Sequence, residues 1–513
     1  MEGRKTKAAR NIAYGLLGQV ITIILSFISR SVFLYCFTKE YVGISSLFAG
    51  ILSFLSLADL GMEASMTVKL YRPLAEENWP LIKALLGYYK RIFNVIALVI
   101  FGAGLLLLPV LDMIVDIPEN VEHVKLIYVL TLANSSVTYL FIYKKILFIA
   151  DQKKYITDIT QYCVTFSEYA VLIPLLLITR SYILYLLTQC GFKLIYNFVI
   201  MALAKKKYVE VDAAQEIKLD DTIKRSIGSD MRAISLHRIG DVVSTHSWTI
   251  LVSSCVNVVT AGLYSNYQLI IGYVKVIMDK VLYALSPSIG NMIVTETEDA
   301  VYGFFEKMMF MSFAMTCICG NCLLCLLNPF IDLWIGDTFQ LTYGVVMVSV
   351  INFYLVNMRK PVLIFKEAYG FFKQDRFRPL IESGISIMAS LFLCLAAKLE
   401  LAGVLLGTTF AYLVTTFWIE PWILFRNGFH KKCRLYFVKY VGYIAFTTAI
   451  MLLSASVCGL LENGFFTFIL SGMVSVAVPA GGIFLVFRRT EEYRWFAAIL
   501  SRSLRKLLHK QLA

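Results

Sequence analysis

The chain has 513 residues, of which 58% are hydrophobic and 16% are charged. Soluble domains average roughly 45–50% apolar and about 25% charged residues, so this composition excludes an ordinary cytosolic enzyme, a fibrous repeat and a disordered chain. The formal net charge is +13, but Lys and Arg fall in short groups between long apolar stretches, which argues against nucleic-acid binding. The composition indicates an integral membrane protein.

Apolar stretches long enough to cross a bilayer recur along the whole chain. A membrane-spanning helix needs ~20 mostly apolar residues, and we predict about fourteen such spans. In chain order they cover residues 12–35, 41–68, 85–110, 124–147, 159–179, 182–203, 231–252, 262–288, 303–326, 341–365, 379–398, 402–425, 437–460 and 465–487. The sequence therefore predicts an all-α polytopic membrane protein.

The distribution of Lys and Arg orients the predicted spans. If the N-terminus is cytoplasmic, the external loops carry only Lys39, Arg180 and Lys398, with Lys125 at a boundary. The reverse topology would translocate almost all of the basic residues, against the positive-inside rule. We therefore predict that both termini are cytoplasmic.

The largest internal loop separates the first six spans from the next six. The predicted parts are residues 1–204 (spans one to six), 205–230 (a cytoplasmic linker), 231–425 (spans seven to twelve), 437–487 (spans thirteen and fourteen) and 488–513 (a basic amphipathic tail). Apolar positions at helical spacing among basic residues are typical of a helix at the membrane surface. The tail is therefore interpreted as an anchor for the last span or as a docking element for cytoplasmic enzymes, and both interpretations stay open.

Spans two and eight share a pattern. Span two opens with Gly43 and reaches Asp59 sixteen residues later, and span eight opens with Gly262 and reaches Asp279 seventeen residues later. Six spans per half put the two halves in the same orientation, and parallel repeats of this kind occur in transporters.

Polar and ionisable side chains form stripes on spans one, two, seven and eight. Ionisable groups are costly in a membrane and usually face a bundle interior or a water-filled cavity, so stripes on four helices favour a hydrated central cavity between two facing halves. The candidate substrate-binding residues are Arg30, Arg238, Trp248, Tyr264, Gln268, Lys275 and Tyr283, and the candidates for ion coupling are Asp59, Asp241 and Asp279.

Structural interpretations of the same residues stay open. Arg238 with Asp241, and Lys275 with Asp279, have the spacing of intrahelical ion pairs, and Asp59 lies near the cytoplasmic end of its span. For Glu168 and Lys193, on adjacent spans, a buried structural pair is the favoured interpretation. No nucleotide-binding, catalytic or metal-ligand pattern stands out, so we expect no enzymatic activity, no cofactor and no metal.

Three stretches carry a family resemblance. They are residues 41–43 running to 57–61 (Leu-Ala-Asp-Leu-Gly), residues 262–267 (Gly-Leu-Tyr-Ser-Asn-Tyr) with 288–291, and residues 333–336 (Leu-Trp-Ile-Gly). With them, the chain resembles polysaccharide flippases of the multidrug/oligosaccharidyl-lipid/polysaccharide exporter superfamily, over nearly its whole length. The resemblance implies two six-helix lobes around a central cavity, which spans one, two, seven and eight line, plus a terminal helix pair.

The resemblance also implies a function. The expected activity is to flip an undecaprenyl-diphosphate-linked oligosaccharide, by alternating access, from the inner to the outer leaflet of a bacterial inner membrane, for O-antigen or capsule synthesis. Its expected partners are that glycan, membrane lipids and polysaccharide-assembly enzymes.

Three alternatives remain. Lipid II flippases of the superfamily also have fourteen spans. Cation-coupled drug or metabolite exporters usually have twelve, and they should combine a more apolar cavity with an isolated carboxylate. A membrane scaffold that transports nothing would not need ionisable stripes on four helices.

Overall fold

Helices form the regular structure of both halves of the chain. The computed structural model describes residues 4–55, 62–111, 120–140, 142–371, 374–460, 464–499 and 501, which contain helices and turns and no strand. The helices up to residue 283 are α1 (Arg4–Cys36), α2 (Lys39–Leu55), α3 (Met62–Ala75), α4 (Trp79–Leu107), the short helix η2 (Leu108–Val110), α6 (Val124–Val137), α7 (Ile142–Ala150), α8 (Lys154–Thr179), α9 (Tyr182–Lys207), α10 (Val209–Ala213), α11 (Asp221–Cys255) and α12 (Val258–Tyr283).

The second half of the chain is also helical, and its described part contains no β-strand. Its helices are α13 (Ser286–Thr295), α14 (Glu298–Ile335), η3 (Asp337–Phe339), α15 (Tyr343–Met358), α16 (Lys360–Ala368), α17 (Arg378–Leu391), the π-helical turn η4 (Phe392–Ala396), α18 (Glu400–Val414), α19 (Thr416–Leu424), the π-helical turn η5 (Phe425–Phe429), α20 (Arg434–Cys458) and α21 (Phe465–Phe487).

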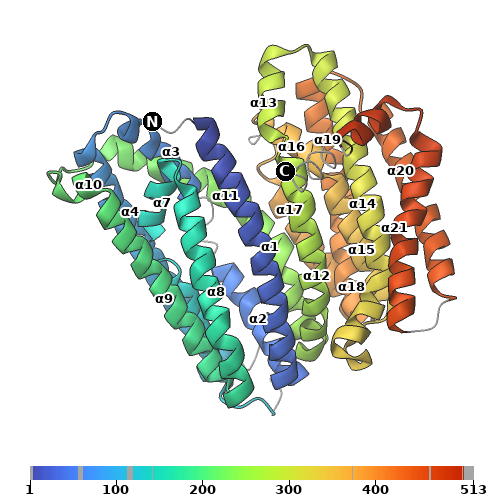
Figure 1. Cartoon of the computed structure of the whole chain (residues 1–513), viewed down its shortest axis with the longest axis horizontal. Helices are drawn as coiled ribbons and strands as arrows, with labels where there is room; N and C mark the ends of the chain where they lie inside the picture. The colour runs from blue at the N-terminus through green and yellow to red at the C-terminus, as the bar shows by residue number, and fades with distance from the viewer. Residues whose placement is uncertain are drawn as a thin grey trace, which may run out of the picture. The chain divides into compact units, whose positions relative to one another are not determined.

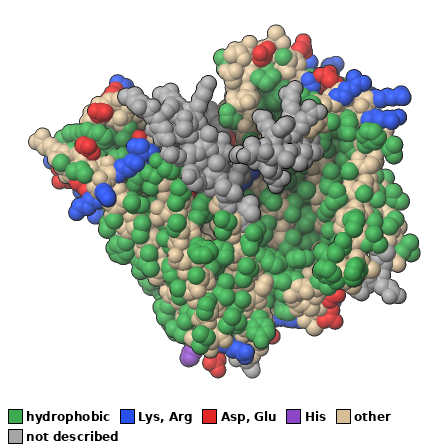
Figure 2. Space-filling model, in the orientation of Figure 1, with side chains coloured by type: hydrophobic (Ala, Val, Ile, Leu, Met, Phe, Trp, Pro, Cys, Tyr) green, Lys and Arg blue, Asp and Glu red, His purple; other side chains and the backbone are tan. Residues whose placement is uncertain are grey.

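Every predicted span coincides with one of these helices or with two consecutive ones. Within the described residues, ten helical segments are long and apolar enough to cross a membrane, and the all-α, multi-pass membrane architecture is thereby confirmed. Predicted spans one, two, seven and eight are not among the ten, and these spans carry the polar stripes. The number fourteen and the cytoplasmic termini stay predictions. On the face shown in Figure 2, hydrophobic side chains cover the middle of the helices and charged side chains gather at their ends.

The chain divides into two compact units, Met1–Gly262 and Leu263–Ala513. Each unit has its own hydrophobic core. In the first unit α1 lies along α8, and α8 lies along α9 (Figure 1). In the second unit α14 packs against α15, α20 and α21, and α17 packs against α18. The predicted division at residues 204 and 231 is based on membrane topology, and it stays a prediction. In the structure, α11 packs against α2 and α3 and therefore belongs to the first unit.

Two long spans of the second unit are interrupted near one end. The α15–α16 segment breaks at Arg359, directly before Lys360 and Pro361, the first two residues of α16. Proline has no N–H to donate, so it is tolerated in the first turn of a helix and not in its interior. The α18–α19 segment breaks at Thr415, whose hydroxyl donates to the Ala411 carbonyl (2.7 Å), a contact that bends helices.

Glycines let α2 approach its neighbours in the first unit closely. A Cβ placed on Gly43 would lie 2.2 Å from the Val258 carbonyl oxygen, and one on Gly262 would lie 2.6 Å from the Gly43 nitrogen. Small residues at such crossings allow backbone contact between membrane helices. The two glycines that open the shared pattern of spans two and eight therefore contact each other.

The described part of the C-terminal tail packs on the second unit. Residues 491–499 are helical, the Lys307 Nζ lies 2.6 Å from the Glu491 carboxylate, and the Trp495 ring makes an edge contact with Phe304. The hydrogen bond from Lys307 lowers the pKa of the Glu491 carboxyl. The interpretations of the tail as an anchor for the last span and as a docking element both stay predictions, and residues 502–513 lie outside the described part.

Candidate functional site

Arg30 lies beside aromatic side chains in the first unit. Its guanidinium carbon is 5.9 Å from the centroid of the Phe33 ring. Phe33 in turn contacts Tyr182 and Tyr185 of α9, at 5.4 and 5.5 Å between ring centroids. On the same stripe of α1, one turn earlier, Ser26 shares a hydrogen bond with Tyr169 of α8 (3.0 Å). The stripe therefore faces α8 and α9 within this unit and surrounds a cation with aromatic rings.

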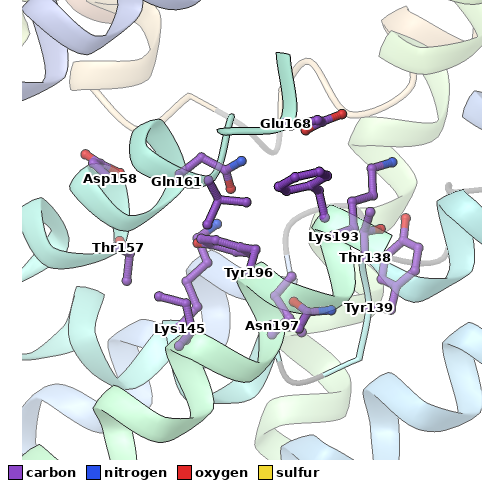
Figure 3. A pocket seen from close by; sticks show the side chains of 14 residues that line it. Thr138, Tyr139, Lys145, Thr157, Asp158, Gln161, Glu168, Lys193, Tyr196 and Asn197 are labelled. Atoms are coloured by element: carbon purple, nitrogen blue, oxygen red, sulfur yellow. The ribbon is translucent and has the colours of Figure 1, made fainter. Parts of the chain in front are cut away.

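A polar cavity of ≈ 360 Å³ lies among α6, α7, α8 and α9 of the first unit. Glu168 and Lys193 stand on the same side of it, with Asp158 on the opposite side (Figure 3). The Lys193 ammonium donates to the Asn134 carbonyl (3.3 Å). Glu168 and Lys193 interact electrostatically, and among the described residues no ion pair within 4 Å joins them.

Three of the predicted site residues cannot be placed at the level of their side chains. Asp59 falls outside the described residues. Arg238 and Asp241 lie on α11, but their side chains belong to the part that is not described. Trp248 also lies on α11, half-buried. Their roles in binding and coupling stay predictions.

The first half of the α12 stripe packs inside the second unit. Tyr264 is only 2% exposed, and its hydroxyl accepts hydrogen bonds from Gln268 and, at 3.5 Å, from Ser349 of α15. One position away from the stripe, Tyr267 donates to Asn328 of α14 (2.6 Å). These contacts fix the orientation of α12 against α14 and α15.

The second half of the stripe meets a residue that the sequence analysis did not single out. Lys360, at the start of α16, places its Nζ 2.8 Å from Asp279 Oδ1 and 5.7 Å from the centroid of the Tyr283 ring. Lys275, one turn before Asp279, interacts electrostatically with both Asp279 and Lys360. Lys360 and Asp279 thus form the ion pair of this group, the α12 lysine site (Lys275, Asp279, Tyr283 and Lys360), and Lys275 lies one turn away on the same face of α12.

A buried ion network lies beside the α12 lysine site. Arg359, adjacent to Lys360, binds Glu420 of α19 through two hydrogen bonds of 2.6 and 2.9 Å. Six charged side chains from α15–α16, the turn before α17, α17 itself and α19 take part: Arg359, Lys366, Asp375, Arg378, Glu382 and Glu420. The Lys366 and Glu420 side chains are 2% and 1% exposed. Three cations balance three anions, so the network is neutral as a whole.

The network and the lysine site have different chemical capacities. Buried charges are stable only when they are paired and hydrogen-bonded, and every charge of the network has an opposite partner within it. The network includes Arg359, and it contacts Thr416, the residue that follows Thr415. The α12 lysine site is less enclosed, with Asp279 34% exposed, and its two lysines can donate to an anion such as a phosphate.

Comparison with known proteins identifies the fold. No family model and no curated protein matches the chain. A solved structure of the lipid II flippase MurJ, in an inward closed conformation, matches with a TM-score of 0.64 and 13% identity over 93% of this chain and 99% of that one. An inward-facing multidrug resistance transporter of the MATE family, of the MOP superfamily, matches at 0.60 and 11% identity, over 79% of this chain and 94% of that one.

A mutant of the Vibrio cholerae MATE transporter VcmN is similar as well, at a TM-score of 0.55 and 14% identity over 83% of this chain and 98% of that one. The chain has the MOP exporter fold. At these identities the likeness concerns the fold alone, and the polysaccharide subtype remains a matter for proposal.

Within the MOP exporter fold of this chain, sequence reasoning found α12 but missed its partners. Lys366, Asp375 and Arg378 fall between predicted spans ten and eleven, and Arg359 and Lys360 lie near the end of span ten. The one available signal was Glu420, a carboxylate inside the apolar stretch 402–425, because an ionisable group at such a position needs a partner. Nothing in the sequence identifies the basic residue that pairs with Glu420.

Proposed function

We propose that this chain is a transporter that flips an undecaprenyl-diphosphate-linked oligosaccharide across a bacterial inner membrane by alternating access. The MOP exporter fold and the multi-pass architecture support a transporter, and the resemblance seen in the sequence supports the substrate. The observation that carries the proposal is the α12 lysine site.

The chemistry of the α12 lysine site fits a diphosphate. A lipid-linked sugar diphosphate is anionic at its diphosphate and polar along its glycan, and moving that head through hydrocarbon without partners is prohibitive. Lys275 and Lys360 offer charge-assisted hydrogen bonds to phosphate oxygens. Asp279 pairs with Lys360 when no anion is bound. Tyr283 supplies an aromatic face of the kind that packs on sugar rings.

The extent of the structural matches is in keeping with a flippase. The flippase structure spans 93% of this chain, whereas the two MATE transporters span 79% and 83% of it although nearly all of their own length is matched. The chain thus has more helical structure than the drug exporters. Ion coupling by Asp59, Asp241 or Asp279 belongs to the same proposal, with Asp279 the least suited because Lys360 already neutralises it.

Charge-removing variants test the proposal in cells. The gene is deleted and complemented with Lys275→Gln, Lys360→Gln or the double variant, and the lipid-linked intermediates left on the cytoplasmic face are extracted and identified. A charge-assisted hydrogen bond is worth ~1.5–3 kcal/mol, so each single variant should reduce export roughly tenfold or more and accumulate a lipid-linked oligosaccharide.

Lys307→Gln is the matched control, because Lys307 pairs with the exposed Glu491 away from α12. Wild-type export by the double variant at normal protein level would contradict the proposal. So would a deletion strain that accumulates no lipid-linked intermediate.

A further inference from the structure

An open apolar groove lies between α19 and α20 on the second unit. Its volume is ≈ 230 Å³, and its lining consists of Trp418, Ile419, Trp422, Cys433 and Phe437. Trp418 and Trp422 are each about half exposed, at 54% and 51%, and the Trp418 ring packs on Phe437 at 4.8 Å between centroids. The groove is therefore a surface of packed aromatic rings on two helices that are apolar enough to lie in a membrane.

Basic side chains surround one end of this groove. The Arg426 guanidinium carbon lies 4.9 Å from the centroid of the Trp422 ring. Lys432 and Arg434 flank the groove residue Cys433 in the chain and are exposed. Among the described residues, no carboxylate lies within ion-pair distance of any of these three cations, in contrast to the neighbouring Lys431, which pairs with Asp299 (2.6 Å).

We propose that this groove binds an anionic phospholipid, with an acyl chain along the aromatic surface and the phosphate on Arg426. Three uncompensated cations at the end of an apolar groove match the two parts of such a lipid, a negative head and a hydrocarbon tail. Basic pockets between membrane helices on the cytoplasmic side bind anionic headgroups in this way. Tryptophan is enriched at the membrane–water interface, at the level of the lipid headgroups. Trp418 and Trp422 therefore suit the boundary between the head and the tail of such a lipid. The site lies apart from the α12 lysine site and does not depend on the transported substrate.

A lipid-binding experiment on the full chain tests the proposal. The protein is purified in a neutral detergent, and native mass spectrometry counts bound lipid as phosphatidylglycerol or phosphatidylcholine is added. Removing Arg426, the phosphate partner, together with one neighbouring cation should reduce the preference for phosphatidylglycerol at least about tenfold. We therefore expect Arg426→Gln/Arg434→Gln to lose the preference for the anionic lipid and to keep its weak binding of phosphatidylcholine.

The second unit offers a matched control. Arg488 and Arg489 are also exposed, and Arg488 also lies over an aromatic ring, that of Phe484 at 5.8 Å, but none of these residues lines the groove. Arg488→Gln/Arg489→Gln removes the same charge and should bind phosphatidylglycerol like the wild type. Equal losses in both double variants would indicate a general attraction of anionic lipid to the basic edge and would overturn the proposal, as would no loss in either.

A second measurement reports the acyl chain. Phosphatidylglycerol with brominated chains quenches tryptophan fluorescence on contact, so in lipid nanodiscs it should quench the wild type more than a Trp418→Phe/Trp422→Phe variant. Equal quenching of both proteins would mean that the acyl chain of the lipid does not lie in the groove.

Discussion

Glu420 is the residue on which the buried ion network depends most. It accepts hydrogen bonds from Arg359 and Lys366, and the Arg378 guanidinium lies 3.2 Å from the same carboxylate. Each of these three cations has lost most of its contact with water. The carboxylate of Glu420 therefore holds together three basic groups that would otherwise repel one another.

Replacing Glu420 by Gln should destabilise the second unit strongly. The change removes one negative charge and leaves an uncompensated buried cation, and breaking a buried pair in this way costs about 3–5 kcal/mol. We expect a clear decrease in the thermal unfolding temperature in detergent. Glu296→Gln, at an exposed position, should leave it unchanged, and equal unfolding temperatures for both variants would contradict a supporting role of the network.

The residues of the α12 stripe could be predicted because helical spacing is written in the sequence. Gln268, Lys275, Asp279 and Tyr283 follow it directly. The pairing of Asp279 with Lys360 could not be predicted in the same way. The two residues are 81 positions apart, and their contact depends on how α16 packs after the break at Arg359.

At the scale of elements, the crossing of α2 with the start of α12 is set by two glycines. A methyl group on Gly43 would lie within 3 Å of backbone atoms of Val258, and backbone cannot rotate away as a side chain can. The close approach therefore requires glycine at Gly43 and Gly262.

Substitution of Gly43 by Ala tests this crossing. We expect a loss of about 1–3 kcal/mol of stability, the usual cost of overpacking, measured as a lower unfolding temperature. Gly442→Ala is the control, because a Cβ there meets nothing within 4 Å and alanine favours a helix by roughly 0.5–1 kcal/mol over glycine. An unchanged or higher unfolding temperature for Gly43→Ala would show that α2 and α12 can separate without cost.

The helices themselves could be predicted well, because a membrane requires each apolar stretch to satisfy its own backbone hydrogen bonds. The interruptions could not. Pro361 lies within the apolar stretch of predicted span ten (341–365), and the break at Thr415 has only a local hydroxyl contact behind it. Both interruptions lie at or next to residues that contact the buried network, and these contacts are a property of the folded unit.

At the scale of the whole molecule, the predicted site residues fall in both units. The first contributes Arg30 and its aromatic neighbours, and the second contributes the α12 lysine site. The sequence predicts that they line a common cavity, and that arrangement stays a prediction. The resemblance to flippases and the MOP exporter fold agree, so the overall architecture was accessible from the sequence. The substrate that the resemblance implies stays a proposal, because it depends on a few side chains rather than on the fold.

The central claim is that the protein itself moves a lipid-linked anionic oligosaccharide across a bilayer. The direct measurement uses the purified protein in liposomes loaded with a labelled undecaprenyl-diphosphate oligosaccharide and records how much becomes accessible to an enzyme added outside. We predict faster exposure with the wild type than with empty liposomes, and roughly tenfold slower exposure with Lys275→Gln/Lys360→Gln. Exposure at the rate of empty liposomes by folded wild-type protein, with a transmembrane ion gradient imposed in either direction, would contradict the claim.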